Sequence, residues 1–368
     1  MTGTEAEGEA VRYAAFDARY RGRDLGGKGA RAALESLPVI DISPFVAGGS
    51  EAARRAVGRA VREACIDIGF FYLAGHGIAP AELDRVLEYG RRFFALPAEE
   101  KMKLHAGKGT GRLGFMQTGG IAPQASSARP PDLKERLSFS REVEPGEPEA
   151  GRFAAGRSQW PDAKLLPDFA PFLMAHIAKR VRLAQHMARA FATSLDLAED
   201  YFDAMFRHLG CVLMFNHYPP LGRAAFARGQ WSFTPHTDYG AFTLLLQDAA
   251  GGLEVRNAAG AWIAVPPRRG TFVVNIGDMF AMWTNDRYMS SLHRVLHFGD
   301  AERLSVPLFT YPNGTTVVRC LDTCHGPGNP PRYPPVVAED YDRALVEQSS
   351  RTGRPGISSR TAERLVLI

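Results

Sequence analysis

The sequence predicts an α+β protein, with a helical amino-terminal half followed by a β-rich carboxyl-terminal half. Before residue 200, apolar residues recur at helical spacing over segments of helical length. After Gly210 the chain changes to short runs of β-type residues that Gly, Pro and Asn separate. Many short strands in close succession are typical of an antiparallel sandwich or barrel. We therefore expect helices to flank a β-structured core.

The composition is that of an ordinary globular protein. Its 368 residues are 45% hydrophobic and 23% charged, with 44 basic and 40 acidic side chains and a net charge of +4. A charge this small on so long a chain does not predict binding to nucleic acid or to an anionic membrane. No run approaches the roughly 18 apolar residues of a membrane span, and the acidic amino terminus does not resemble a secretion signal. We expect a cytoplasmic protein.

The chain divides into four predicted regions. Residues 1–37 are rich in Gly, Ala, Arg and Glu and lack an apolar period, which predicts a flexible extension. Residues 38–200 form the helical region, 201–350 the β-rich core and 351–368 a polar tail. Within the helical region, residues 105–160 have the Gly, Pro and Ser content of a long loop, and such loops are more often functional than idle.

The individual elements are predicted from local spacing. Apolar residues four apart indicate helices, one of which has Pro80 in its first turn, and short apolar runs bounded by Gly, Pro or Asn indicate strands. In the first half we expect a strand over 37–42, a helix over 51–68, a strand over 69–73 and helices over 79–94 and 168–195. In the second half we expect strands over 211–218, 242–247, 253–255, 262–265, 271–276, 294–297, 305–310 and 315–319, and a helix over 339–348.

Two histidines and an aspartate in the β-rich half form a candidate metal site. His236 and Asp238 are two residues apart, so an extended backbone points both side chains to the same side. His293 would reach the same place from a distant strand. Two imidazoles and one carboxylate leave three octahedral positions open, which is typical of non-haem Fe(II) oxygenases. Zinc is the alternative metal, although it would leave O₂ chemistry undone. A polar strand end that happens to contain two histidines is the alternative to a metal site.

An Arg-x-Ser pair follows ten residues after His293. Arg303 and Ser305 share one strand face, where a guanidinium can pair with a carboxylate and a hydroxyl can add a hydrogen bond. A keto diacid that chelates the metal would need this anchor for its distal carboxylate. The charges then cancel, because the metal ion and Arg303 balance Asp238 and the diacid. An exposed arginine with a structural role is the alternative.

A third element lies at the start of the β-rich half. Met214, Asn216 and Tyr218 alternate along one predicted strand and therefore face the same way. An amide and a phenol on that face could hydrogen-bond the keto acid. A core tyrosine with a satisfied hydroxyl is the alternative.

Three further histidines are weaker candidates. His297 is a rival to His293, because four residues later on a strand it would face the same side. His76 lies in a Gly-His-Gly turn, which favours a structural role. His217 alternates away from its neighbours on the third element and so belongs to the opposite face.

Taken together, these motifs resemble the isopenicillin N synthase-like family of 2-oxoglutarate/Fe(II)-dependent dioxygenases. The resemblance rests on the His-x-Asp…His set, the Arg-x-Ser pair and the Asn-x-Tyr-Pro-Pro element, and it extends from about Pro38 to Gln348. Four further segments match the family's pattern in order: 38–43, 69–78, the Asp-x-Lys-Glu motif over 132–135, and the Gly-Asp…Trp-Thr-Asn stretch over 277–285.

The resemblance implies a distorted double-stranded β-helix, or jelly-roll, core with flanking helices. It implies an enzyme that uses Fe(II), 2-oxoglutarate and O₂ to hydroxylate, desaturate or cyclise a small organic molecule of secondary metabolism, with release of succinate and CO₂. The residues implied are His236, Asp238 and His293 for iron, and Arg303, Ser305, Tyr218 and Asn216 for 2-oxoglutarate. The alternatives are an isopenicillin N synthase-type Fe(II) oxidase that does not use 2-oxoglutarate, and a non-catalytic binding protein on the same fold.

The substrate pocket is predicted by alternation and by the resemblance. Steps of two along the strand of Arg303 reach Phe309 and Tyr311, and Met214 would join them from the neighbouring strand. The region 112–139 resembles the part of the family that covers the substrate, which adds Phe115. Arginines there would suit a carboxylated substrate, but a natural-product intermediate, an amino-acid derivative and a nucleobase all stay open.

Overall fold

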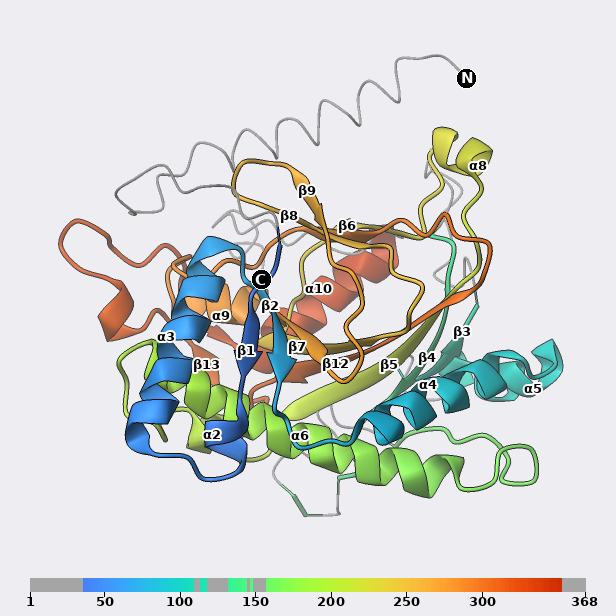
Figure 1. Ribbon diagram of the computed structural model, residues 1–368, viewed down its shortest axis with the longest axis horizontal. Coiled ribbons are helices and arrows are strands. Elements are labelled where there is room, and N and C mark those ends of the chain that lie inside the picture. The colour runs from blue at the N-terminus through green and yellow to red at the C-terminus, as the bar shows by residue number, and fades with distance from the viewer. Residues whose placement is uncertain (1–35, 109–112, 118–131, 144–145, 148–156, 353–368) are drawn as a thin grey trace.

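Two β-sheets form the centre of the molecule (Figure 1). The computed structural model describes residues 36–108, 113–117, 132–143, 146–147 and 157–352. The strands of the larger sheet are β1 (Val39–Asp41), β2 (Phe70–Ala74), β3 (Gly114–Met116), β4 (Glu135–Phe139), β5 (Gly210–Tyr218), β7 (Phe242–Gln247), β10 (Phe272–Ile276) and β12 (Arg303–Tyr311). The smaller sheet contains β6 (Phe233–His236), β8 (Leu253–Arg256), β9 (Trp262–Ala264) and β11 (His293–Val295), and β13 (Val317–Val318) pairs with β14 (Val336–Val337).

The strand order shows how the two halves of the chain combine. The larger sheet runs β1-β2-β10-β7-β12-β5-β4-β3 and the smaller one β6-β11-β8-β9. Neighbouring strands are antiparallel except β1 and β2, which are parallel. Strands from the amino-terminal half therefore extend both edges of the larger sheet. The α+β class and the jelly-roll core that the sequence predicts are confirmed.

Helices flank the sheets: α2 (Ser43–Val46), α3 (Glu51–Asp67), α4 (Pro80–Phe94), α5 (Ala98–Lys103), α6 (Phe169–Ser194), α7 (Asp203–Phe206), α8 (Arg223–Ala227), α9 (Asp278–Trp283) and α10 (Ala338–Thr352). Ser50 caps α3, because its side chain accepts a hydrogen bond from the N–H of Ala53, and Pro80 opens α4 as the sequence predicts. Among the described helices, none combines the length and apolar character that crossing a lipid bilayer requires.

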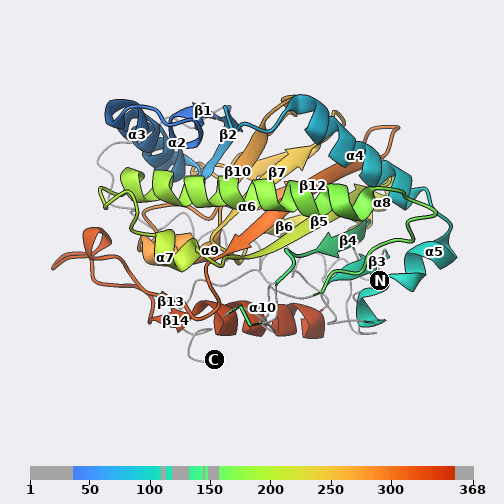
Figure 2. The ribbon, with the colours of Figure 1, turned by 90° about the horizontal axis from the view of Figure 1, so that it is seen from below.

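The outer face of the larger sheet packs against α6, which Figure 2 shows lying across it. Apolar side chains of α6 such as Leu173 and Ile177 are buried in the cluster between helix and sheet. The fully buried Arg180 of α6 donates hydrogen bonds to the carbonyl oxygens of Leu244 and Val306. Burial lowers the pKa of this guanidinium to about 9. The helix is thus fixed to β7 and β12 by directional bonds as well as by its apolar stripe.

The inner face of the larger sheet meets the smaller sheet. Because successive strand residues point to opposite faces, every second residue of these strands faces inward. Apolar residues from both sheets, including Tyr72 and Val295, form a second cluster between them. Elsewhere the inner face is polar: in one row of the register, Ser305 of β12 lies between Asn216 of β5 and Gln247 of β7. The candidate site lies along this polar part.

The structure differs from the prediction between residues 105 and 160. We predicted a loop there, but β3 and β4 extend the larger sheet beyond β5. The two strands lie in a segment whose Gly, Pro and Ser content predicts a loop. Pairing of β4 with β5 and of β3 with β4 stabilises them.

The first and last described residues of the structure differ slightly from the predicted bounds of the terminal regions. Leu37, which the predictions place both at the end of the extension and at the start of the first strand, is buried in the cluster between the sheets. Helix α10 continues four residues beyond its predicted end, to Thr352. The remainder of the predicted extension and tail, residues 1–35 and 353–368, lies outside the described residues.

Gly69 connects α3 to β2 at a point of close packing. Its φ of +70° lies in the left-handed region, and a Cβ there would overlap the carbonyl oxygen of Met289. The N–H of Met289 in turn donates to the carbonyl oxygen of Cys65 in α3. The missing side chain at Gly69 therefore lets the α3–β2 turn hold the segment that leads into β11.

We predict that Gly69→Ala destabilises the protein by at least about 3 kcal/mol, because a left-handed alanine costs roughly 1–2 kcal/mol before the overlap is added. Gly48→Ala is the matched control, since its φ is +81° but nothing lies within 4 Å of a new Cβ. Gly48→Ala should lose only the roughly 1–2 kcal/mol of stability that a left-handed alanine backbone costs. Urea unfolding of both variants measures the difference, and equal losses would contradict the role assigned to Gly69.

Candidate metal centre

Three buried side chains converge between the two sheets. His236 ends β6, Asp238 follows it, and His293 opens β11 directly opposite His236 in the antiparallel register. The Nε2 atoms of His236 and His293 lie 3.8 and 3.7 Å from Oδ1 of Asp238. In the part of the chain that the structure describes, this is the one group of three such donors close enough to hold a metal ion. Two imidazoles and a carboxylate fit Fe(II) with open positions.

Both histidines have the ring nitrogen orientation that a metal ligand needs. Nδ1 of His236 lies 2.8 Å from the carbonyl oxygen of Thr234, and Nδ1 of His293 lies 3.2 Å from that of Ser291. A carbonyl oxygen can only accept, so Nδ1 carries the proton in each ring and Nε2 offers its lone pair to the centre. Burial lowers the pKa of His236 well below its usual value, which keeps this ring neutral.

The carboxylate of Asp238 is held by two inner-face residues of the larger sheet. Its Oδ2 accepts hydrogen bonds from the hydroxyl of Thr243 on β7 at 2.5 Å and from the amide of Asn275 on β10 at 2.7 Å. Thr243 and Asn275 are partners in the β7–β10 register, so the sheet presents both donors side by side. This leaves Oδ1 directed at the two imidazoles.

Asp278 connects the two segments that carry the ligands. Its N–H donates to the carbonyl oxygen of Asp238 at 2.8 Å. Its carboxylate accepts hydrogen bonds from the hydroxyls of Thr237 at 3.3 Å and Ser290 at 2.7 Å. Since Ser290 lies three residues before His293, one buried carboxylate fixes the turn after β6 relative to the start of β11.

Arg303 lies at the start of β12 and is almost completely buried, with 1% of its surface exposed. Its Nε donates to the carbonyl oxygen of Gly251, and its Nη2 donates to Oε1 of Gln247 at 3.0 Å. Its Nη1 is buried and has no hydrogen-bond partner among the described residues. Leaving a charged donor buried and unpaired costs about 1–3 kcal/mol or more, so this geometry favours binding of an anion at Nη1.

The other predicted cosubstrate residues surround this guanidinium. In the β5–β12 register Arg303 lies opposite Tyr218 and Ser305 opposite Asn216, and the Arg303 guanidinium lies 4.9 Å from the centre of the Tyr218 ring. Burial raises the pKa of Tyr218, so its hydroxyl stays protonated and can donate. Oδ1 of Asn216 is buried without a partner among the described residues. The donors of this set, the Arg303 guanidinium and the Tyr218 hydroxyl, fit a keto acid with a distal carboxylate.

By alternation, three of the predicted pocket residues share a strand face with the cosubstrate residues. Met214 alternates with Asn216 on β5, and Phe309 and Tyr311 alternate with Ser305 on β12. Their contact with a substrate stays a prediction. Arg112 and Arg129, which would suit a carboxylated substrate, lie outside the described residues.

Phe115 does not line the inner face, and this part of the prediction is wrong. Its ring is 6.0 Å from that of Phe93 in α4, and the ammonium of Lys101 in α5 lies 5.5 Å from it. Alternation along β3 turns Phe115 toward the helices and its neighbour Met116 toward the inner face, where Met116 contacts Arg136.

The other histidines have structural partners. Nε2 of His297, the rival to His293, bonds the carbonyl oxygen of Ala301, and His297 is not part of the metal-binding group. His217 stacks on Phe94 of α4 with ring centres 4.8 Å apart, which confirms the opposite face. His76 bonds a backbone carbonyl of the loop before β10.

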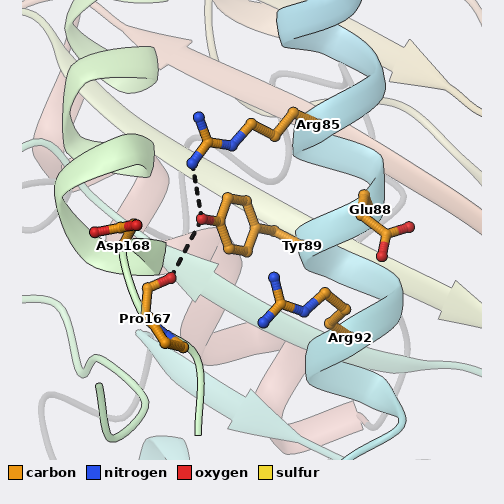
Figure 3. A pocket seen from close by; sticks show the side chains of 6 residues that line it. All are labelled: Arg85, Glu88, Tyr89, Arg92, Pro167 and Asp168. Atoms are coloured by element: carbon orange, nitrogen blue, oxygen red, sulfur yellow. Dashed lines mark hydrogen bonds between the residues drawn. The ribbon is translucent and has the colours of Figure 1, made fainter. Parts of the chain in front are cut away.

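A separate hollow of about 380 Å³ lies between α4 and the start of α6 (Figure 3). The Arg85 guanidinium donates to the Tyr89 hydroxyl at 3.0 Å, and that hydroxyl donates to the carbonyl oxygen of Pro167 at 3.2 Å. Arg92 also packs on the Tyr89 ring. The hollow therefore lies on the helix-covered side of the larger sheet and does not contain the residues of the metal centre.

Sequence reasoning missed the residues that hold the ligands in place. Thr243, Asn275 and Gln247 were within predicted strands but received no role. The available signal was an amide at Asn275 inside the otherwise apolar run over 272–276. Only the sheet register shows that this amide faces Asp238.

Two family models match the chain. The first, described as non-haem dioxygenase in morphine synthesis N-terminal, matches residues 37–163. The second, described as 2OG-Fe(II) oxygenase superfamily, matches residues 209–312, which include the three candidate metal ligands and the candidate cosubstrate residues.

Similar proteins agree with these matches over most of the chain. The 2-oxoglutarate-Fe(II) type oxidoreductase hxnY of Emericella nidulans is 36% identical over 319 residues, which cover 85% of this chain and 90% of that protein. The 2-oxoglutarate-dependent dioxygenase citB of Monascus ruber is 36% identical over 297 residues, covering 78% and 88%. Among solved structures, a full-length Neurospora crassa protein in complex with alpha-KG has a TM-score of 0.77 and 28% identity, over 89% of this chain and 99% of that one.

We predict that Asn275→Leu weakens Fe(II) binding about 10- to 100-fold, the usual effect of removing a partner that orients a metal ligand. Thr310→Val is the control, because the Thr310 hydroxyl bonds the carbonyl oxygen of Phe242 rather than Asp238. Anaerobic Fe(II) titration measures both variants. Wild-type affinity in Asn275→Leu would show that this bond does not orient the carboxylate.

Proposed function

Because this chain belongs to the isopenicillin N synthase-like family of 2-oxoglutarate- and Fe(II)-dependent oxygenases, we propose that its triad and its buried arginine divide the task of binding iron and cosubstrate. His236, Asp238 and His293 hold Fe(II), and Arg303 with Ser305 holds the distal carboxylate of 2-oxoglutarate. The enzyme oxidises a small organic molecule and releases succinate and CO₂. The observation that carries the residue assignment is the unpaired Nη1 of Arg303 beside an intact triad.

The bound iron, together with 2-oxoglutarate and O₂, supplies the oxidising power for attack on a C–H bond. The residues of this chain orient and protect that centre. His236, His293 and Asp238 would supply three ligands to the iron and leave its other positions to cosubstrate and O₂. The triad residues are buried, and a buried centre limits access of water to it.

The cosubstrate is held by charge and by hydrogen bonds. Nη1 of Arg303 and the hydroxyl of Ser305 donate to the distal carboxylate, and the Tyr218 hydroxyl adds a third donor. Asn216, opposite Ser305 in the register, contributes its amide to the same site. Iron and Arg303 balance the charges of Asp238 and the keto diacid, so the buried assembly is neutral overall.

An oxidase that works without 2-oxoglutarate is the alternative function of such a triad. Such an enzyme would leave Nη1 of Arg303 buried without a partner, at a cost that the distal carboxylate of a bound keto acid removes. A non-catalytic binding protein would have no need of the hydrogen bonds that orient all three ligands. The site therefore favours the 2-oxoglutarate-dependent oxygenase.

We predict that chelation abolishes the conversion of 2-oxoglutarate to succinate and that Fe(II) restores it, whereas Zn(II) does not, because Zn(II) has no redox chemistry. Succinate release from the chelated and reconstituted protein is the measurement. Oxygen consumption by the reconstituted protein that is independent of added 2-oxoglutarate would favour the oxidase instead.

We predict that Arg303→Lys raises the KM for 2-oxoglutarate at least about tenfold, because an ammonium keeps the charge but loses the two-pronged geometry of the guanidinium. Arg294→Lys is the control: Arg294 pairs with Glu254 at 2.6 Å on the other side of β11 and should leave the KM unchanged. Steady-state succinate assays give both values. An unchanged KM in Arg303→Lys would remove Arg303 from the cosubstrate site.

A further inference from the structure

Lys134 lies next to the metal centre and has no part in the proposed binding of iron or cosubstrate. It directly precedes β4, whose first residue pairs with His217 of β5, so Lys134 lies at the level of Tyr218. Its Nζ is 3.1 Å from the centre of the Phe233 ring, and that ring is 4.0 Å from the ring of His236. The ammonium therefore points toward the triad.

No carboxylate among the described residues forms an ion pair or hydrogen bond with this ammonium. Asp132, two residues before it, accepts hydrogen bonds from the N–H and hydroxyl of Thr234 at 3.3 and 3.1 Å. Oδ2 of Asp238 accepts hydrogen bonds from Thr243 and Asn275, and its Oδ1 is directed at the two imidazoles.

The surroundings of the ammonium disfavour its charge. Lys134 as a whole is half-buried, but its charged end lies against an aromatic ring, which replaces only part of the solvation that the ammonium loses. This desolvation lowers the pKa of Lys134 to about 7. A bound anion would oppose that loss of charge.

The loaded centre does not supply this anion. Iron, 2-oxoglutarate, Asp238 and Arg303 already sum to zero charge, and the distal carboxylate has its own guanidinium. The positive charge of Lys134 is additional to this balance.

The residues that follow Lys134 extend a polar wall on the same face. Glu135 and Leu137 point to the outer face, where Glu135 pairs with Lys101, so Arg136 and Ser138 point inward with Lys134. Arg136 donates to Sδ of Met116 across the β3–β4 pair. The hydroxyl of Ser138 is completely buried and has no partner among the described residues.

We propose that Lys134 binds a carboxylate group of the organic substrate, with Arg136 and Ser138 along the same wall. This inference rests on the proposed function, because it places the substrate beside that iron centre. A single ammonium is a point charge without the paired donors of a guanidinium, so the class it fits is a small molecule with one carboxylate near the reacting carbon. The substrate carboxylate then sits over Lys134 and the C–H bond to be oxidised points toward the triad.

The test compares acids with amides of the same shape. Benzoate, phenylacetate and octanoate, each beside its primary amide, are titrated anaerobically into the protein loaded with Fe(II) and 2-oxoglutarate. Binding is read from the change in the visible iron–keto acid absorption band, which needs no turnover. Lys134→Met removes the charge at nearly constant length, and Lys164→Met, at an exposed lysine, is the matched control.

We expect wild-type protein and Lys164→Met to bind at least one acid about tenfold or more tightly than its amide. Lys134→Met should lose that preference while its affinity for 2-oxoglutarate stays within about threefold of wild type. The proposal is overturned if no acid is preferred by the wild type, if Lys134→Met keeps the preference, or if Lys134→Met loses 2-oxoglutarate affinity, which would make Lys134 a cosubstrate residue. A wild-type protein that forms no absorption band would instead refute the proposed function, and this inference with it.

Discussion

The centre of this protein depends on the orientation of one buried carboxylate, that of Asp238. Two donors from neighbouring strands, Thr243 and Asn275, occupy one oxygen and turn the other toward two imidazoles. Hydrogen bonds to a charged group contribute about 1.5–3 kcal/mol each, enough to fix the rotamer of a short side chain. The metal ligands come from the end of β6, the turn after it and the start of β11. Because Thr243 and Asn275 lie on β7 and β10, the middle of the larger sheet fixes the position of Asp238 among them.

The two faces of that sheet have different tasks. The outer face carries the apolar residues that pack on α6 and its neighbours, and this packing holds the jelly roll together. The inner face carries the polar rows in which Arg303 lies opposite Tyr218 and Ser305 opposite Asn216. A shift of one residue in the β5–β12 register would exchange these faces. The packing that stabilises the fold therefore also sets the geometry of the site.

The hydrogen-bond partners of a buried cation show whether it stabilises the fold or is available to bind a ligand. Arg180 on the outer side donates to two backbone carbonyls of the central strands and lies over the ring of Phe272, so its surroundings are structural. Arg303 on the inner side keeps one buried nitrogen without a partner, and Lys134 has an aromatic ring as its neighbour. Arg180 therefore stabilises the fold. Arg303 and Lys134 have no carboxylate partner within the described ranges of the chain, and we assign their anions to the cosubstrate and the substrate, respectively.

The sequence by itself determined the class of the fold, the long helices, most of the core strands and the residues of the triad and the Arg-x-Ser pair, because alternation and motif spacing are local properties. It did not determine β3 and β4, which become strands because β4 pairs with β5 and β3 with β4, or the outward direction of Phe115. Nor did it assign a role to Asn275, which lies outside the motifs, or to Lys134, whose Asp-x-Lys-Glu motif supports the resemblance without indicating what the lysine contacts. Tertiary structure decided these points, because a side chain's partner is set by strand register and by which sheet face meets the second sheet.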